Sequence, residues 1–278
     1  MTQRRLVGGA IYALSAAIGL LAFVYPFFVP AVSQAAGPNV RGTDAPLLTA
    51  ALVGLSVVAL LVELQGQAIN AKTVAMLGVL VAVTSVLRFL EVTFPLPGGF
   101  SPIFAPIIIS GYVFGGRFGY LMGTFTLLAS ALITGGVGPW LPYQMFTAGW
   151  AGLTAGWLRH LPGLRQHRPH ESQPLEFRAR DLAVLSVFGF LWGLLYGVII
   201  NVYFWPFAAG PADQSWAPGI SLRQTLGRYA VFYAVTSLVW DLFRAVGNVV
   251  LILLLGAPMA KTLTRFRRRF HFQVGSHA

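Results

Sequence analysis

Two pairs of oppositely charged residues stand out because each lies in a long apolar stretch. Arg88 and Glu91 are three residues apart, and so are Asp241 and Arg244. Residues at that spacing share one face of a helix, so each pair can form an ion pair. Charged side chains inside apolar helices are rare and often mark a functional site. Both pairs are therefore candidates for contacts with a polar ligand, and a purely structural ion pair is the alternative for each.

Aromatic and amide side chains near the ends of apolar stretches form a second set of candidate binding residues. This set comprises Trp140, Gln144, Asn201, Tyr233 and Trp240. Amides and phenols supply hydrogen bonds, and indole rings cover apolar ligand surface. Trp140 and Trp240 have an alternative explanation, because tryptophan is also enriched at membrane–water interfaces.

The residues needed for several kinds of catalysis are missing from the places where they would act. The chain has no Cys, which excludes disulfides, Cys-ligated metals and thiol catalysis. All five His residues fall outside the apolar stretches: His160, His167, His170, His271 and His277. The sequence also contains no G-x-x-x-x-G-K-[ST] phosphate loop. We therefore expect no enzymatic activity, no metal site and no cofactor.

The apolar stretches themselves predict an all-α integral membrane protein. Hydrophobic residues make up 56% of the 278 and charged residues only 10%, against about 25% charged in soluble domains. The apolar runs are continuous rather than alternating, and helices satisfy every backbone polar group within a bilayer. The run lengths predict eight spanning helices, near 6–28, 46–65, 71–91, 103–115, 118–135, 143–158, 181–204 and 228–256.

The net charge of +11 reflects topology in this prediction and does not indicate nucleic-acid binding. With eight spans, 14 of the 19 Lys and Arg fall on the side that carries both chain ends. They flank apolar runs, with clusters in the polar linker 159–180 and in the basic tail 261–278. Because positive residues accumulate on the cytoplasmic side, both termini are expected in the cytoplasm.

The stretch from Phe100 to Leu158 carries the densest pattern. Gly149, Gly152 and Gly156 make a smooth helix face, which by itself indicates close helix packing. The wider pattern consists of Gly111, Phe114, Gly115, Gly119 and Gly123, followed by Gly136, Gly138, Pro139, Trp140, Pro142 and Gln144. In this order the residues resemble the substrate-binding S-components of energy-coupling-factor (ECF) vitamin transporters. The resemblance covers about 68–260.

This resemblance implies a domain organisation and a function. The core would be six helices over 67–260, preceded by two extra helices in 1–66 that the family pattern lacks. Such proteins lie in the cytoplasmic membrane of prokaryotes and bind a vitamin from outside. They deliver it by reorienting in the bilayer, driven by a transmembrane coupling protein and two ATPase subunits. The Gly-Pro-Trp-x-Pro-x-Gln loop looks most like the cobalamin-type branch, and riboflavin, pantothenate or a thiamine precursor remain alternatives.

The resemblance also assigns roles to a helix face and to two loops. The family's small-x-x-x-small contact with the coupling protein would fall on Gly78 and Ala82, for which intramolecular packing is the alternative. The ligand would lie under the loops 92–102 and 135–142, whose glycines permit movement and whose prolines limit it.

Two other functions fit a polytopic membrane protein. A self-contained secondary transporter would work without ATPases and usually shows repeated halves, which the sequence lacks. A membrane-embedded enzyme or assembly factor acting on lipids could use the basic linker 159–180 to bind anionic head groups. It would need a catalytic constellation, and none is found.

Overall fold

The structure is a computed structural model that describes residues 2–24, 27, 54, 71–94, 97–161, 177–208 and 210–270, and all regular elements in these ranges are helical. The elements are α1 (Thr2–Val24), α4 (Ala71–Thr93), the short η2 (Pro97–Gly99), α5 (Phe104–Phe114), α6 (Gly116–Thr134), α7 (Leu141–Leu158), α8 (Ala179–Phe204), η3 (Trp205–Phe207), α9 (Leu222–Thr236) and α10 (Leu238–Phe270). Within these ranges, α4, α6, α8 and α10 are long and apolar enough to cross a membrane. The expected all-α membrane class is confirmed.

Most expected spans coincide with a helix, and one does not. The expected span at 46–65 lies outside the described residues. The expected single span at 228–256 is wrong, because the chain bends at Ser237 (φ −131°, ψ −28°) and forms α9 and α10. Thr236 Oγ1 donates to the Phe232 carbonyl oxygen at 2.7 Å, and Asn201 Nδ2 on α8 donates to Ser237 Oγ at 2.7 Å. Such hydroxyl bonds bend helices without interrupting their apolar pattern.

Helices α5, α6 and α7 approach so closely that only glycine fits between them. A side chain at Gly111 or at Gly119 would overlap the carbonyl oxygen of Gly152, and one at Gly123 would overlap that of Ala148. Close backbone approach of this kind maximises van der Waals contact where water provides no driving force. Side chains at Gly152 and Gly156 would likewise overlap the backbone of Gly119 and Gly116, so the helix-packing interpretation of these two glycines is confirmed.

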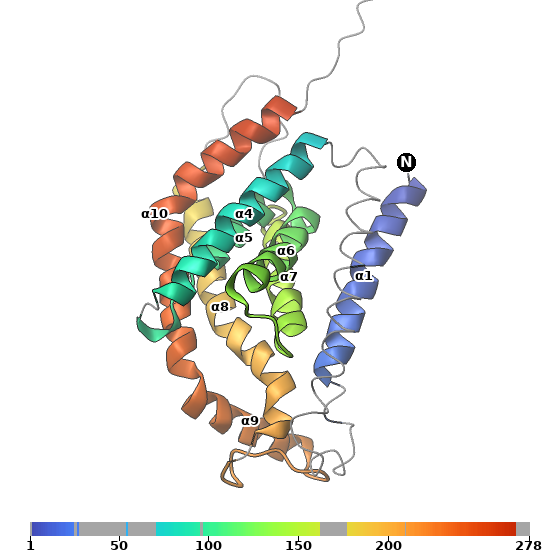
Figure 1. The fold of residues 1–278 in the computed structure, drawn as a ribbon, viewed down its shortest axis with the longest axis vertical. Coiled ribbons are helices and arrows are strands. Elements are labelled where there is room, and N and C mark those ends of the chain that lie inside the picture. Colours follow the sequence, from blue (N-terminus) through green and yellow to red (C-terminus); the bar gives the residue numbers. More distant parts are fainter. Residues whose placement is uncertain are drawn as a thin grey trace, which may run out of the picture.

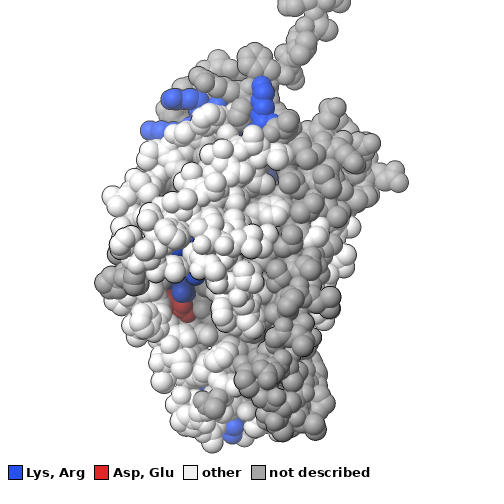
Figure 2. Space-filling view, in the orientation of Figure 1, with Lys and Arg blue, Asp and Glu red and all other residues white. Residues whose placement is uncertain are grey.

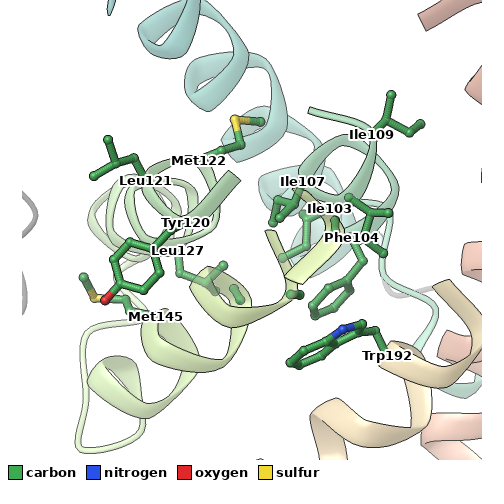
Figure 3. Close-up of a cluster of buried hydrophobic side chains, with 14 of the residues drawn as sticks. Ile103, Phe104, Ile107, Ile109, Tyr120, Leu121, Met122, Leu127, Met145 and Trp192 are labelled. Atoms are coloured by element: carbon green, nitrogen blue, oxygen red, sulfur yellow. The ribbon is translucent and has the colours of Figure 1, made fainter. Parts of the chain in front are cut away.

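The buried core lies around these three helices and reaches α8. Figure 3 shows side chains of α5, α6 and α7 gathered in this core, with Phe104 and Trp192 directed toward each other. Trp192 on α8 is buried, and its Nε1 donates to Thr154 Oγ1 on α7 at 3.1 Å. A buried indole needs such a partner, so α8 is fixed in orientation against α7.

Helix α1 packs on the α6–α7 side of this core. Ser15 and Tyr120 share a hydrogen bond, and the rings of Tyr12 and Tyr120 meet edge to face at 5.5 Å. Gly19 leaves room for Phe146 and Trp150. In Figure 1, α1 and α10 flank the bundle on opposite sides. The N-terminal helix is thus joined to the core by specific contacts.

The start of α1 and the last turns of α10 lie at the same end of the bundle in Figure 1. The α8–α9 connection lies at the opposite end, and the α4–α5 and α6–α7 connections lie part of the way toward it. We call this side of the bundle the distal end.

Candidate functional site

The last turns of α4 place a charged pair at the start of the α4–α5 connection. Arg88 Nη1 donates to Glu91 Oε1, and Ser101 Oγ donates to Glu91 Oε2 at 2.9 Å. The exposed fractions of the Arg88 and Glu91 side chains are 26% and 13%. Ser101 is itself buried, so the Glu91 carboxylate is held between α4 and the connection that follows it.

The second expected pair forms near the start of α10. Arg244 Nη1 donates to Asp241 Oδ1. Asp241 is only 2% exposed, and its Oδ2 accepts no hydrogen bond in the described part of the chain. Gly197 on α8 makes this burial possible, because a side chain at that position would overlap the Asp241 carboxylate. The carboxylate therefore has one unused acceptor pressed against α8.

Tyr196 brings the two pairs together. The Arg244 guanidinium lies 5.0 Å from the centre of the Tyr196 ring, and Phe104 meets the same ring edge to face at 4.8 Å. Four charges act on this phenol: Arg88, Glu91, Asp241 and Arg244. The Tyr196 hydroxyl makes no hydrogen bond within the described ranges. We call these four residues and Tyr196 the charge cluster.

Sequence analysis missed Tyr196. In the sequence, Tyr196 is marked only as a tyrosine beside a glycine within an otherwise apolar span. This is a weaker indication of a binding residue than a pair of opposite charges is. A phenol that lies among charged side chains is a ready contact for a bound polar group. Tyr196 therefore belongs with the candidate binding residues.

The described part of the α4–α5 connection rests on α10 beside the charge cluster. Gly98 and Gly99 have φ of 71° and 72°, a left-handed conformation that favours glycine. Gly98 lies against the Phe243 ring, and the Cβ of Trp240 lies 3.5 Å from the place that a side chain at Gly99 would take. One helical turn further on, Gly247 leaves room for Phe100. Part of the expected loop 92–102 thus forms a cap seated on α10, and Trp240 is one of its supports.

Figure 2 shows where charge reaches the surface. Among the coloured and white residues, a small spot of blue and red lies near the middle of the face, a small blue spot lies near the lower end, and further blue side chains gather at the upper end. Arg88 is the more exposed member of the α4 pair, and α4 touches α10 only sparingly. The α4 pair is therefore the more exposed part of the charge cluster.

Trp140 ends the α6–α7 connection, and Gln144 lies in the first turns of α7. The Trp140 ring folds back over Gly138, and its Nε1 donates to the Gly136 carbonyl oxygen at 3.2 Å. Gln144 is half-buried, and its side-chain amide has no hydrogen-bond partner in the described part of the chain. No described contact joins either residue to the charge cluster.

Asn201 and Tyr233 hold α9 against α8. The Asn201 amide donates a hydrogen bond to Ser237 Oγ, and the Tyr233 hydroxyl donates one to the Leu194 carbonyl oxygen at 3.4 Å. Tyr233 also lies beside Asp241, and its hydroxyl interacts with the Asp241 carboxylate. Both residues thus border the charge cluster, with Asn201 engaged at the helix bend.

The expected contact face on α4 is open. Gly78 and Ala82 are exposed, and no atom lies within 4 Å of the place that a Gly78 side chain would take. Packing within the chain therefore does not explain these two small residues in the described structure. Among the described residues, no three His, Cys, Asp or Glu side chains come together.

Comparisons with known proteins agree with the resemblance in the sequence. A family model described as the substrate-specific component of ECF transporters matches residues 72–256, from the start of α4 to the middle of α10. No curated protein and no solved structure matches the chain significantly. Helix α1 lies outside the matched region.

Proposed function

Because the chain belongs to the substrate-specific components of ECF transporters, we propose that it binds a vitamin within the membrane and delivers it by reorienting in the bilayer. A transmembrane coupling protein and two ATPase subunits drive this movement. The observation that carries the proposal is the charge cluster beneath a glycine-rich cap. It combines a phenol that lies among four charged side chains with a cover whose glycines allow it to open.

The distribution of charge supports an orientation for this function. Lys72, Arg117, Arg159, Lys261 and Arg265 belong to the helix ends opposite the distal end. By the positive-inside rule this end faces the cytoplasm of a prokaryotic cell, and both termini lie there. The charge cluster then lies in the outer half of the bundle, where a vitamin arrives.

The ligand pocket combines the charge cluster with the neighbouring polar residues. Gln144 offers a half-buried amide that is free to hydrogen-bond, and Trp140 offers an apolar ring if it swings away from Gly138. Cobalamin or a precursor is the favoured vitamin, because the Trp140 loop resembles that branch of the family. A large corrinoid would contact both distal loops at once.

Uptake by purified components tests the function. The chain is reconstituted in proteoliposomes with a coupling protein and its two ATPases, and uptake of labelled cobalamin and riboflavin is measured. We expect uptake only when all components and ATP are present. Uptake by the chain alone along an ion gradient would favour a secondary transporter. Modification of lipid without uptake would favour a lipid-acting enzyme.

The exposed face of α4 is the proposed contact with the coupling protein. Ala75 continues the row of exposed small residues that includes Gly78 and Ala82, and these positions follow one another at helical spacing. A flat face of this kind lets a second helix approach closely in lipid, where shape complementarity replaces the hydrophobic effect.

Changing Gly78 and Ala82 together to Leu is expected to abolish ATP-driven uptake while vitamin binding by the isolated chain is unchanged. The bulky side chains would hold the partner helix away, yet they would face open space in the chain itself. Val83→Leu on the same exposed side is the matched control and should transport normally. If the double variant loses binding as well as uptake, these residues serve only the fold.

A further inference from the structure

The charge cluster is electrically balanced. Its two guanidinium groups and two carboxylates are the charges that act on Tyr196, and among the described residues no other charged side chain does so. The two pairs come from different helices, since Arg88 and Glu91 belong to α4 and Asp241 and Arg244 to α10. Arg244 also interacts electrostatically with Glu91, so the pairs form one system across the helix boundary.

From this balance we infer that the site selects vitamins without net charge, as uncharged polar molecules or zwitterions. The inference rests on the proposed function, because it assigns the ligand to the charge cluster. It divides the vitamins that the sequence left open, because cobalamin and riboflavin carry no net charge near neutral pH and pantothenate is an anion. Thiamine, which is a cation, serves as the positively charged probe.

The physical reason is that charge is poorly screened between buried helices. Interaction energies between charges rise as the effective dielectric constant falls below that of water. An anionic ligand can pair with Arg88 or Arg244 only by displacing a carboxylate that then stays unpaired nearby. A cationic ligand has the same difficulty with Glu91 and Asp241. A ligand without net charge can hydrogen-bond to the Tyr196 hydroxyl while both ion pairs persist.

A binding panel on the purified full-length chain tests the inference. Equilibrium binding of labelled cyanocobalamin, riboflavin, pantothenate and thiamine is measured without ATPase partners. We expect one of the two uncharged vitamins to bind at least tenfold more tightly than either charged one. If pantothenate or thiamine binds most tightly, the inference is overturned while the proposed function stands. If none of the four binds and none copurifies with the chain, the proposed function falls, and the inference with it.

Charge-changing variants provide the second arm. Glu91→Gln keeps an oxygen for Ser101 but leaves the cluster with one excess positive charge, so the ratio of pantothenate to uncharged-vitamin affinity should rise at least tenfold. Arg88→Gln should shift the ratio toward thiamine by a similar factor. Arg223→Gln, at an exposed position of α9, changes the net charge equally at the same end of the protein and should leave the ratios unchanged. A charge-balanced site would be contradicted if Arg223→Gln changed the affinity ratios as much as the other two variants do. It would also be contradicted if neither Glu91→Gln nor Arg88→Gln changed them.

Discussion

Gly152→Val is expected to prevent the chain from folding into a stable bundle. A side chain at this position would overlap the carbonyl and Cα of Gly119, and Gly119 in turn lies against Gly111. Because the obstacles are backbone atoms on two helices, no rotamer change can relieve the overlap. The expected loss of stability exceeds the ~1–3 kcal/mol that is typical of overpacked cores. It would be seen as a loss of monodisperse protein in detergent and a lower apparent Tm.

Two other glycines provide matched controls for this change. Gly227 on α9 and Gly78 on α4 also lie within helices, but no atom lies within 4 Å of the place that their side chains would take. Gly227→Val and Gly78→Val should therefore purify and melt nearly as the parent protein does. If Gly152→Val behaves like these two, the close packing of α6 and α7 does not limit stability.

Gly197→Ala is expected to weaken vitamin binding by about 100-fold or more, equivalent to about 2.8 kcal/mol. The added methyl group would overlap the Asp241 carboxylate, which must rotate away from α8 and from Arg244. Arg244 would then remain over Tyr196 as an unpaired charge. Separating a buried ion pair typically costs about 3–5 kcal/mol, so the apparent Tm should fall as well.

The control for this second variant lies on the same helix. A side chain at Gly189 would meet Cδ1 of Ile252, which is the flexible end of a side chain that can move aside. Gly189→Ala should therefore keep binding within about twofold, a change of well under 1 kcal/mol. Equal binding losses in both variants would mean that general loosening of the α8–α10 contact, and not the position of Asp241, causes the effect.

The sequence predicted the helices well because the signal for each is local. An apolar run of about 20 residues has few alternatives in a bilayer, and most boundaries were correct to within a few residues. The bend at Ser237 was missed since it depends on a hydrogen bond from Asn201, which is 36 residues away in the chain. Nothing in the apolar pattern between 228 and 256 marks this partner.

Part of the charge cluster was predicted from the sequence because the spacing of charged residues within one helix is also a local signal. Spacing predicted that Arg88 would pair with Glu91 and Asp241 with Arg244, and both ion pairs are present. Spacing could not show that the two pairs meet at Tyr196, because that depends on how α4, α8 and α10 are arranged. It also grouped Trp140 with the charged residues, whereas the structure places its ring on its own loop. That Trp140 and the charge cluster line the same ligand pocket remains a proposal.

The central claim is that this chain alone binds a vitamin, and native mass spectrometry of the detergent-solubilised protein tests it most directly. We expect a single small molecule bound in a 1:1 ratio without any ATPase subunit, identified after release as a vitamin or vitamin precursor. It should be largely absent from Gly197→Ala and retained by Gly189→Ala. A parent protein that carries no such ligand, and takes none up when incubated with the vitamin panel, would contradict the claim.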